Sequence, residues 1–188
     1  MSNYKIVTQP AVEPLTVQEV KTYTRITQAL QDNLIGSWIK TGRELIEQHL
    51  RRVLITQTID LVFDGYPSTV FEIPNPPLQS VTSIKYYDTS DIEYTFSSSN
   101  YFVSTFDVGR VALNYNVLWP TTLLRPIDSV AVRYVAGYGD SASDVPQRIK
   151  DALYLYCAYR NDNRTGENEK IPDAFYNLLN YAFVASGE

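Results

Sequence analysis

The stretch Val53-Leu54-Ile55-Thr56-Gln57-Thr58-Ile59-Asp60-Leu61-Val62-Phe63 decides the fold, because the pattern of the sequence changes there. It is rich in β-branched and apolar residues, and it runs directly into Asp64-Gly65-Tyr66-Pro67. Both features are typical of a strand that ends in a turn. The residues before it follow a helical pattern instead, so the chain changes from helices to strands near residue 53.

Working back towards the N-terminus, the first clear element is a short helix. Thr16 and Glu19 have the spacing of a capping box, and Leu15 and Val20 are placed where a hydrophobic staple would close. Two independent start signals therefore agree, and they predict a helix over residues 17–26.

A polar turn is expected over residues 27–32, and a longer helix follows it. Gly36 and Gly42 weaken that helix, but they leave room for another helix to approach closely. Its apolar residues recur mostly at the three- and four-residue spacing of an amphipathic helix: Leu34, Ile35, Trp38, Ile39, Leu45, Ile46, His49 and Leu50.

Towards the C-terminus, further strand-like runs alternate with segments rich in Pro, Asp, Asn, Ser and Gly. The runs cover residues 70–73, 81–87, 92–96, 101–106, 110–115 and 129–135. Short strands separated by frequent turns are typical of a small antiparallel sandwich or barrel.

The pattern becomes helical again after Gly137-Tyr138-Gly139-Asp140. Asp144 is placed to cap a helix, and Pro146 suits its first turn. A polar loop is expected over residues 161–170, and Pro172 and Asp173 then open a last helix. The apolar stripes of the two helices are Ile149, Ala152, Leu153, Tyr156 and Cys157, then Phe175, Leu178, Leu179, Ala182 and Phe183.

The predicted fold class is therefore α+β. A small helical bundle is formed by residues 1–52 and 141–188, and an antiparallel β-sandwich or barrel-like domain over residues 53–140 interrupts it. Three consecutive units are the rival arrangement. It is less attractive, because the first helices alone could not bury their apolar stripes.

Composition limits the class of protein. The chain has 188 residues and a formal net charge of −5, with nine Asp or Glu and four Lys or Arg in residues 53–140. This acidity argues against sequence-specific DNA binding. No apolar run is long enough to span a membrane, and no secretory signal is recognised, so a soluble protein made in the cytoplasm is expected. The fifteen tyrosines favour protein interfaces or a β-rich segment.

A search for chemistry predicts no catalytic residue, no cofactor-binding residue and no metal ligand. His49 is the one histidine and is expected in the core or an interface, while Cys157 is expected to be a small core residue. Four acids could pair for acid–base work or bind calcium, but turn positions explain them better: Asp60, Asp64, Asp88 and Asp91. No Cys/His cluster has metal-ligand spacing.

Two other motifs are also better explained by structure. Gly137-x-Gly139 lacks the third glycine of a dinucleotide-binding fingerprint, so turn or hinge glycines are expected. Tyr86-Tyr87 could stack on bases, but an acidic β segment is a poor place to hold single-stranded nucleic acid.

Several stretches, in order along nearly the whole chain, resemble the head–tail connector (adaptor, head-completion) proteins of tailed bacteriophages, in their longer form with an inserted β domain. The most specific is Ile73-Pro74-Asn75-Pro76-Pro77-Leu78-Gln79-Ser80-Val81-Thr82-Ser83-Ile84-Lys85-Tyr86-Tyr87-Asp88. The others are Leu15-Thr16-Val17-Gln18-Glu19-Val20-Lys21, Leu34-Ile35, Thr41-Gly42-Arg43, Ile55-Thr56-Gln57-Thr58, Val117-Leu118-Trp119-Pro120, Val132-Arg133-Tyr134-Val135-Ala136-Gly137-Tyr138-Gly139 and Val145-Pro146-Gln147-Arg148-Ile149-Lys150.

This resemblance implies a structural virion protein without enzymatic activity or cofactor. Its subunits would form a ring of about twelve copies beneath the portal protein, extending the DNA channel and offering a platform for the tail or its stopper. The chain would lie near DNA without binding it specifically, would not enter a membrane, and would be located in the virion neck after assembly in the host cytoplasm.

Three other functions stay open at this stage. One is a different neck or tail-completion protein of the virion. Another is a β-sandwich module that binds glycans on exposed Tyr and Trp119, although the flanking helices count against it. The last is a hydrolase whose site is assembled from residues distant in sequence.

Overall fold

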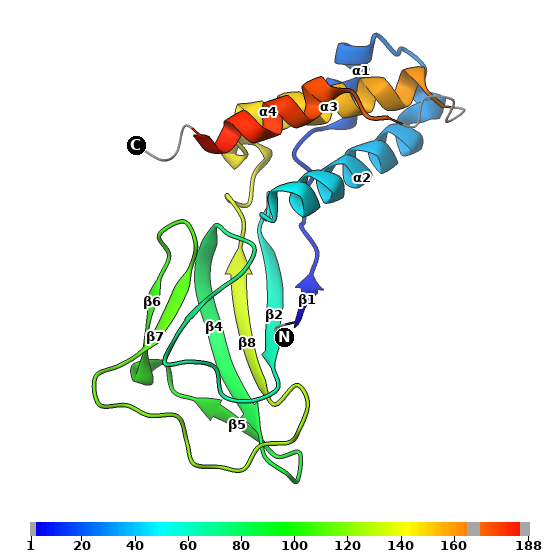
Figure 1. Ribbon diagram of the computed structural model, residues 1–188. Helices are drawn as coiled ribbons and strands as arrows, with labels where there is room; N and C mark the ends of the chain where they lie inside the picture. The colour runs from blue at the N-terminus through cyan, green and yellow to red at the C-terminus, as the bar shows by residue number, and fades with distance from the viewer. Residues whose placement is uncertain (1–2, 165–169, 185–188) are drawn as a thin grey trace. The chain divides into compact units, whose positions relative to one another are not determined.

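The computed structural model describes residues 3–164 and 170–184 of the chain. Over these residues it contains four α-helices and eight strands paired antiparallel, so the predicted α+β class is confirmed. The chain divides into two compact units (Figure 1). Met1–Pro10 and Thr56–Tyr138 make up the β unit, and Ala11–Ile55 and Gly139–Glu188 make up the helical unit.

The helical unit contains α1 (Val17–Thr24), α2 (Asp32–Leu50), α3 (Gln147–Asp162) and α4 (Asp173–Val184), with 3-10 turns at Ala29–Gln31 and Ala142–Asp144. Helix α3 packs against each of the other three. They share a core of solvent-excluded apolar side chains: Val20, Ile35, Ile39, Ile46, Ile149, Leu153, Phe175 and Leu179. Helices from before and after the β unit thus bury their apolar stripes against one another.

Helix α1 begins with the predicted capping box. The Thr16 side chain accepts a hydrogen bond from the Glu19 backbone N–H at 3.2 Å, and Glu19 Oε2 accepts one from the Thr16 N–H at 2.7 Å. These hydrogen bonds from Thr16 hold the pKa of Glu19 below its usual range. The helix ends at Thr24, two residues earlier than predicted, because Arg25 adopts the left-handed conformation with φ of 58°.

Thr16→Ala should lower the free energy of unfolding by about 1 kcal/mol, because an N–H of the first helical turn loses its acceptor. Urea unfolding followed by far-ultraviolet circular dichroism would measure the change. Thr22→Ala is the matched control on the same helix. Its hydroxyl only donates to the Gln18 carbonyl, so that variant should be neutral or slightly stabilised. Equal losses in the two variants would contradict a role for the cap.

The two glycines of α2 differ in what surrounds them. A Cβ atom at Gly42 would collide with the Leu153 side chain and come within 2.7 Å of Tyr156 Cδ1. Gly42 therefore gives α3 its close approach to α2, as the sequence predicted. A Cβ at Gly36 would meet nothing within 4 Å, so the same prediction is wrong for Gly36.

A buried arginine connects separate segments of the helical unit. The side chain of Arg43, on α2, is 1% exposed and bonds to Glu13 Oε2 at 2.8 Å and to Glu47 Oε2 at 2.7 Å. The other oxygen of Glu47 accepts the backbone N–H of Leu54 at 3.0 Å. One guanidinium therefore connects the segment before α1, the helix α2 and the segment that follows α2.

The β unit is built from two antiparallel sheets. The larger has the order β1-β2-β8-β4-β5, and the smaller has the order β3-β7-β6. Phe63 on the larger sheet contacts Phe71 on the smaller with ring centroids 5.6 Å apart, so apolar side chains lie between the sheets as in a sandwich. The strands are β1 (Asn3–Thr8), β2 (Gln57–Phe63), β3 (Val70–Glu72), β4 (Leu78–Tyr87), β5 (Glu93–Phe96), β6 (Tyr101–Ser104), β7 (Arg110–Leu113) and β8 (Val130–Ala136).

Strand β1 was not predicted, and it changes the division of the chain. Residues 1–10 belong to the β unit and not to the helical part, because β1 pairs with β2 along the edge of the larger sheet. Most of its side chains are exposed, so β1 lacks the alternation of buried and exposed residues that reveals a strand in a sequence. The two units meet at 55/56 and at 138/139.

The start of α3 differs from the prediction in detail. The side chain of Asp144 accepts the N–H of Ser141 at 2.9 Å and so caps the preceding 3-10 turn instead of α3. Pro146 is the residue that precedes the first turn of α3.

Candidate assembly surfaces

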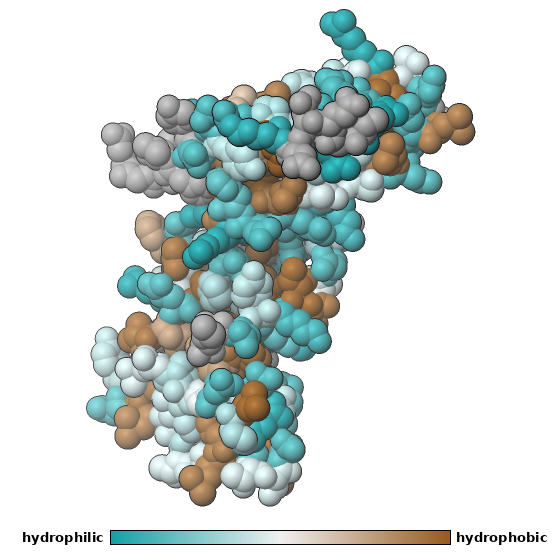
Figure 2. All heavy atoms as spheres, turned by 45° about the vertical axis from the view of Figure 1, so that its right-hand side comes forward, coloured by the Kyte–Doolittle hydropathy of each residue, from teal (hydrophilic) through white to brown (hydrophobic). Residues whose placement is uncertain are grey.

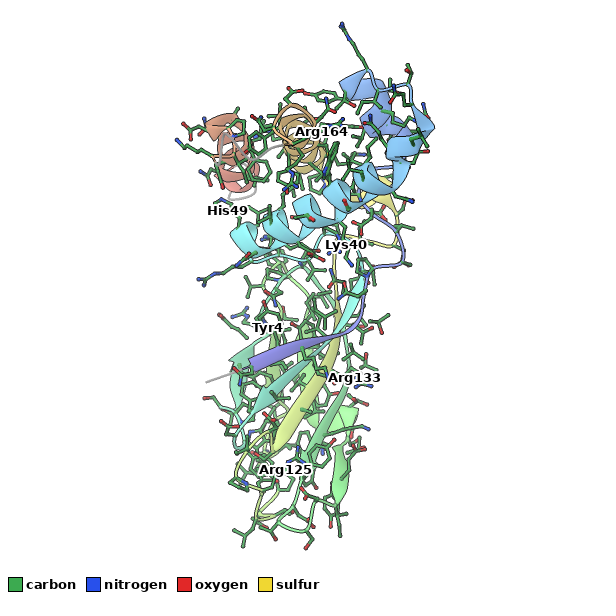
Figure 3. The ribbon with its side chains drawn as sticks, turned by 90° about the vertical axis from the view of Figure 1, so that its right-hand side faces the viewer. Tyr4, Lys40, His49, Arg125, Arg133 and Arg164 are labelled. Carbon is green, nitrogen blue, oxygen red and sulfur yellow. The ribbon has the colours of Figure 1, made fainter. Side chains whose placement is uncertain are left out.

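The single histidine lies outside the core. His49 is exposed on α2, with Nε2 3.4 Å from Asn180 Oδ1 and its ring 5.3 Å from that of Tyr176 (Figure 3). It borders a shallow hollow of about 270 Å³ whose other lining residues are Leu45, Gln48, Ile171, Phe175 and Tyr176. The lining places no serine, cysteine or carboxylate side chain beside His49, so the hollow contains no triad-like pairing of nucleophile, histidine and carboxylate. Of the two positions expected for His49, the core is therefore wrong, and the interface stays a prediction.

The single cysteine lies in the core, as predicted. Cys157 on α3 is fully buried, and burial raises the pKa of its thiol to about 12. A thiol with such a pKa is protonated at neutral pH and is therefore unreactive.

The four acids singled out in the sequence do not come together as one site. Asp60 lies on the face of the larger sheet and binds Arg133 through both oxygens at 2.8 Å. Asp64 lies in the loop after β2, and Asp88 and Asp91 lie in the turn between β4 and β5. In the part of the chain that the structure describes, no group of three or more His, Cys, Asp or Glu side chains is arranged to hold a metal ion.

The remaining motifs have structural roles. Tyr86 stacks on Tyr94 with centroids 5.3 Å apart, and Arg125 covers the ring of Tyr87 at 4.1 Å, so neither ring is free on both faces to stack on a base. Gly137 has φ of 133°, which is the backbone conformation of a turn glycine.

The exposed face of the larger sheet carries a row of paired charges. Register places Lys5 beside Asp60, and Asp60 beside Arg133. Further along the row, Lys85 binds Glu93 at 2.6 Å. Hydrogen bonds from Lys85 and Tyr87 hold the pKa of Glu93 below its usual range. Opposite charges thus balance one another across the five strands of the larger sheet, which makes this face hydrophilic without strong net charge.

A long loop, residues 114–129, closes one end of the β unit; we call it the tip loop. Trp119 anchors its middle, with its ring 4.8 Å from that of Phe96 and 5.4 Å from that of Tyr66. Trp119 is half-buried in this aromatic cluster. Its ring is therefore not displayed as the exposed platform that a glycan site would need.

On both sides of Trp119 the tip loop turns apolar side chains outward. Leu118 and Leu123 are each 79% exposed, and Ile127 is 66% exposed. Figure 2 shows such hydrophobic side chains, in brown, among hydrophilic ones over the lower part of the β unit. Sequence reasoning missed this surface. Its signal was present, however, because three aliphatic residues in a segment without strand or helix pattern have no core face to occupy.

Comparisons with known proteins identify the family. The model of the head completion protein family matches residues 13–171, which is most of the chain. The chain belongs to the head completion protein family. A comparison with curated proteins finds no match. In the described part of this head completion protein, none of the helices combines the length and the apolar character that a membrane crossing requires.

Solved structures of similar fold come from gene transfer agent (GTA) particles. The neck of the empty GTA particle computed with C6 symmetry contains a chain that is 19% identical with a TM-score of 0.80, covering 95% of this head completion protein and 94% of that chain. The virion of the native GTA particle contains a chain that is 18% identical with a TM-score of 0.79, covering 95% of this protein and 93% of that chain. The neck of the native GTA particle computed with C12 symmetry contains a chain that is 18% identical with a TM-score of 0.75, covering 96% of this protein and 93% of that chain.

Proposed function

We propose that this head completion protein is a structural component of the virion neck. Its subunits form a closed ring beneath the portal, extend the DNA channel and provide the platform on which a tail or stopper protein attaches. The observation that carries the proposal is the family match over residues 13–171. The similarity in fold to chains from GTA necks supports it, and a C12 symmetry is consistent with a ring of twelve subunits.

Features of the surface are consistent with assembly. Exposed apolar side chains occur on both units, for example Leu34 at 42% on the helical unit and Phe106 at 88% on the β unit. Apolar surface that remains open in a single chain favours burial against partners. Ring contacts of this kind join two different patches, because self-complementary patches would give closed dimers.

The balanced sheet face and the acidity of the β unit suit proximity to DNA without specific binding. Paired charges such as Asp60 with Arg133 leave no free row of cations for phosphates to bind. We infer no catalytic activity and no cofactor. The sites of action are the host cytoplasm during assembly and the neck of the finished virion.

The proposal predicts that the purified chain is monomeric or heterogeneous alone and becomes a closed ring when the portal ring of the same phage is added. A symmetric portal holds many identical docking sites close together, so weak lateral contacts become sufficient. Native mass spectrometry and negative-stain electron microscopy, with and without portal, would measure this. A two-fold dimer that persists on dilution and ignores the portal would contradict the proposal.

A further inference from the structure

We propose that the tip loop is a docking site for a different protein, one whose contact surface is apolar at its centre and bordered by lysine and arginine side chains. The inference rests on the proposed function, since a neck protein must bind proteins other than itself. Three observations carry it: a pinned backbone, outward apolar side chains, and an acidic border.

The pinned backbone is the first observation. Trp119 packs into the aromatic cluster, and Leu124 pairs with Asp88 as an isolated β-bridge. Arg125 then fixes the end of the loop: its guanidinium donates to the carbonyl of Asp128 at 2.7 Å and to Asp91 Oδ1 at 3.2 Å (Figure 3). A loop held at three points presents its remaining side chains in a fixed arrangement, which lowers the entropic cost of binding.

The outward apolar side chains beside these anchors are the second observation. Leu118 and Ile127 flank the anchors at Trp119 and Arg125, and Leu123 precedes Leu124. Ile92, 52% exposed, extends the same surface from the β4–β5 turn. Exposing an aliphatic side chain to water is unfavourable in free energy. A loop whose backbone is fixed, and which still holds several of these side chains outward, therefore indicates a surface that another protein covers.

The acidic border is the third observation, and it selects the partner. Asp64, Asp88, Asp91 and Asp128 meet at this end of the β unit, where Asp64 Oδ1 accepts the Asp128 N–H at 3.0 Å. Hydrogen bonds from the backbone N–H groups of Ile92 and Ser90 hold the pKa of Asp88 below its usual range, so it stays charged. The one cation among them, Arg125, is already occupied.

This charge excludes other occupants of the tip loop. Nucleic acid and anionic lipid headgroups would be repelled by the four carboxylates. A second copy that docked tip loop to tip loop is disfavoured, because it would bring its own four carboxylates against these. Charge complementarity therefore points to a basic border on a different protein.

Two sets of substitutions test the proposal on the full chain. Leu118→Ser with Leu123→Ser removes the apolar centre. Asp91→Asn with Asp128→Asn removes two border charges, and asparagine tolerates their left-handed φ angles of 59° and 49°. The amide oxygen of Asn at position 91 can still accept the hydrogen bond from Arg125, so this anchor of the loop is kept. Leu30→Ser is the matched control, an aliphatic side chain that is 97% exposed on the helical unit. Because all these side chains lie at the surface, the thermal midpoint should not change in any variant.

The measurement is binding of each variant to two probes, the purified portal ring and the purified tail-side neck protein of the same phage. For one of the two probes, the Leu118/Leu123 variant should lose affinity by at least about tenfold, while Leu30→Ser should bind like wild type. Raising the salt from about 50 to 300 mM should weaken wild-type binding more than that of the Asp91/Asp128 variant.

The outcomes separate this proposal from the proposed function. If wild type binds neither probe, both proposals fail. If wild type binds and forms rings, but the Leu118/Leu123 variant binds both probes normally, only the docking site is refuted. Self-association or DNA binding that depends on Leu118 and Leu123 would identify a different occupant and refute it too.

Discussion

Arg43→Ala should lower the free energy of unfolding by about 3–5 kcal/mol, the usual cost of removing one partner from a buried ion pair. The guanidinium is 1% exposed and bonds to Glu13 and Glu47, whose side chains are 31% and 14% exposed. Alanine leaves both carboxylates without their cation and opens a cavity the length of an arginine. Urea unfolding followed by far-ultraviolet circular dichroism would measure the loss.

Lys40→Ala is the control for Arg43, since it removes a cation from an exposed position of the same helix (Figure 3). It should change the free energy of unfolding by no more than about 0.5 kcal/mol. Burial tends to lower the pKa of Arg43, but Glu47 and Glu13 raise it above its ordinary value. The Arg43 side chain therefore stays charged. If Arg43→Ala lost no more free energy of unfolding than Lys40→Ala, the ion pairs of Arg43 would not stabilise the helical unit.

Local signals account for what the sequence predicted well. The capping box of α1 needs only Thr16 and Glu19, which are three residues apart, so spacing alone reveals it. The strands from β2 to β8 have turn residues between them and apolar residues facing the core, so they too were found within a few residues of their ends. The core position of Cys157 was predictable for the same reason, because the residue lies in the apolar stripe of α3.

Features that depend on distant partners could not be predicted in this way. The burial of Arg43 could not be predicted, because its pairing with Glu13 across 30 residues leaves no periodic trace. Strand β1 forms because β2 offers a free edge, which its own exposed side chains do not reveal. The tip loop surface depends on where Trp119 and Arg125 anchor the backbone, and those contacts join segments far apart in sequence.

The two glycines of α2 provide the sharpest test of how the helical unit packs, because the same substitution should have opposite effects. Gly36→Ala should stabilise the protein by up to about 1 kcal/mol, since alanine is the better helix former and its Cβ meets nothing within 4 Å. Gly42→Ala gains the same propensity but forces a methyl group against Leu153 and Tyr156 on α3.

Overpacking of this kind costs about 1–3 kcal/mol, and the colliding atoms at Gly42 belong to fully or almost fully buried side chains that have little room to move. Gly42→Ala should therefore be the less stable variant, measured by urea unfolding under identical conditions. Gly36→Ala is its matched control for the change in helix propensity. Equal stability of the two variants would mean that α3 can move away from α2 at little cost, and that the close approach at Gly42 does not hold these helices together.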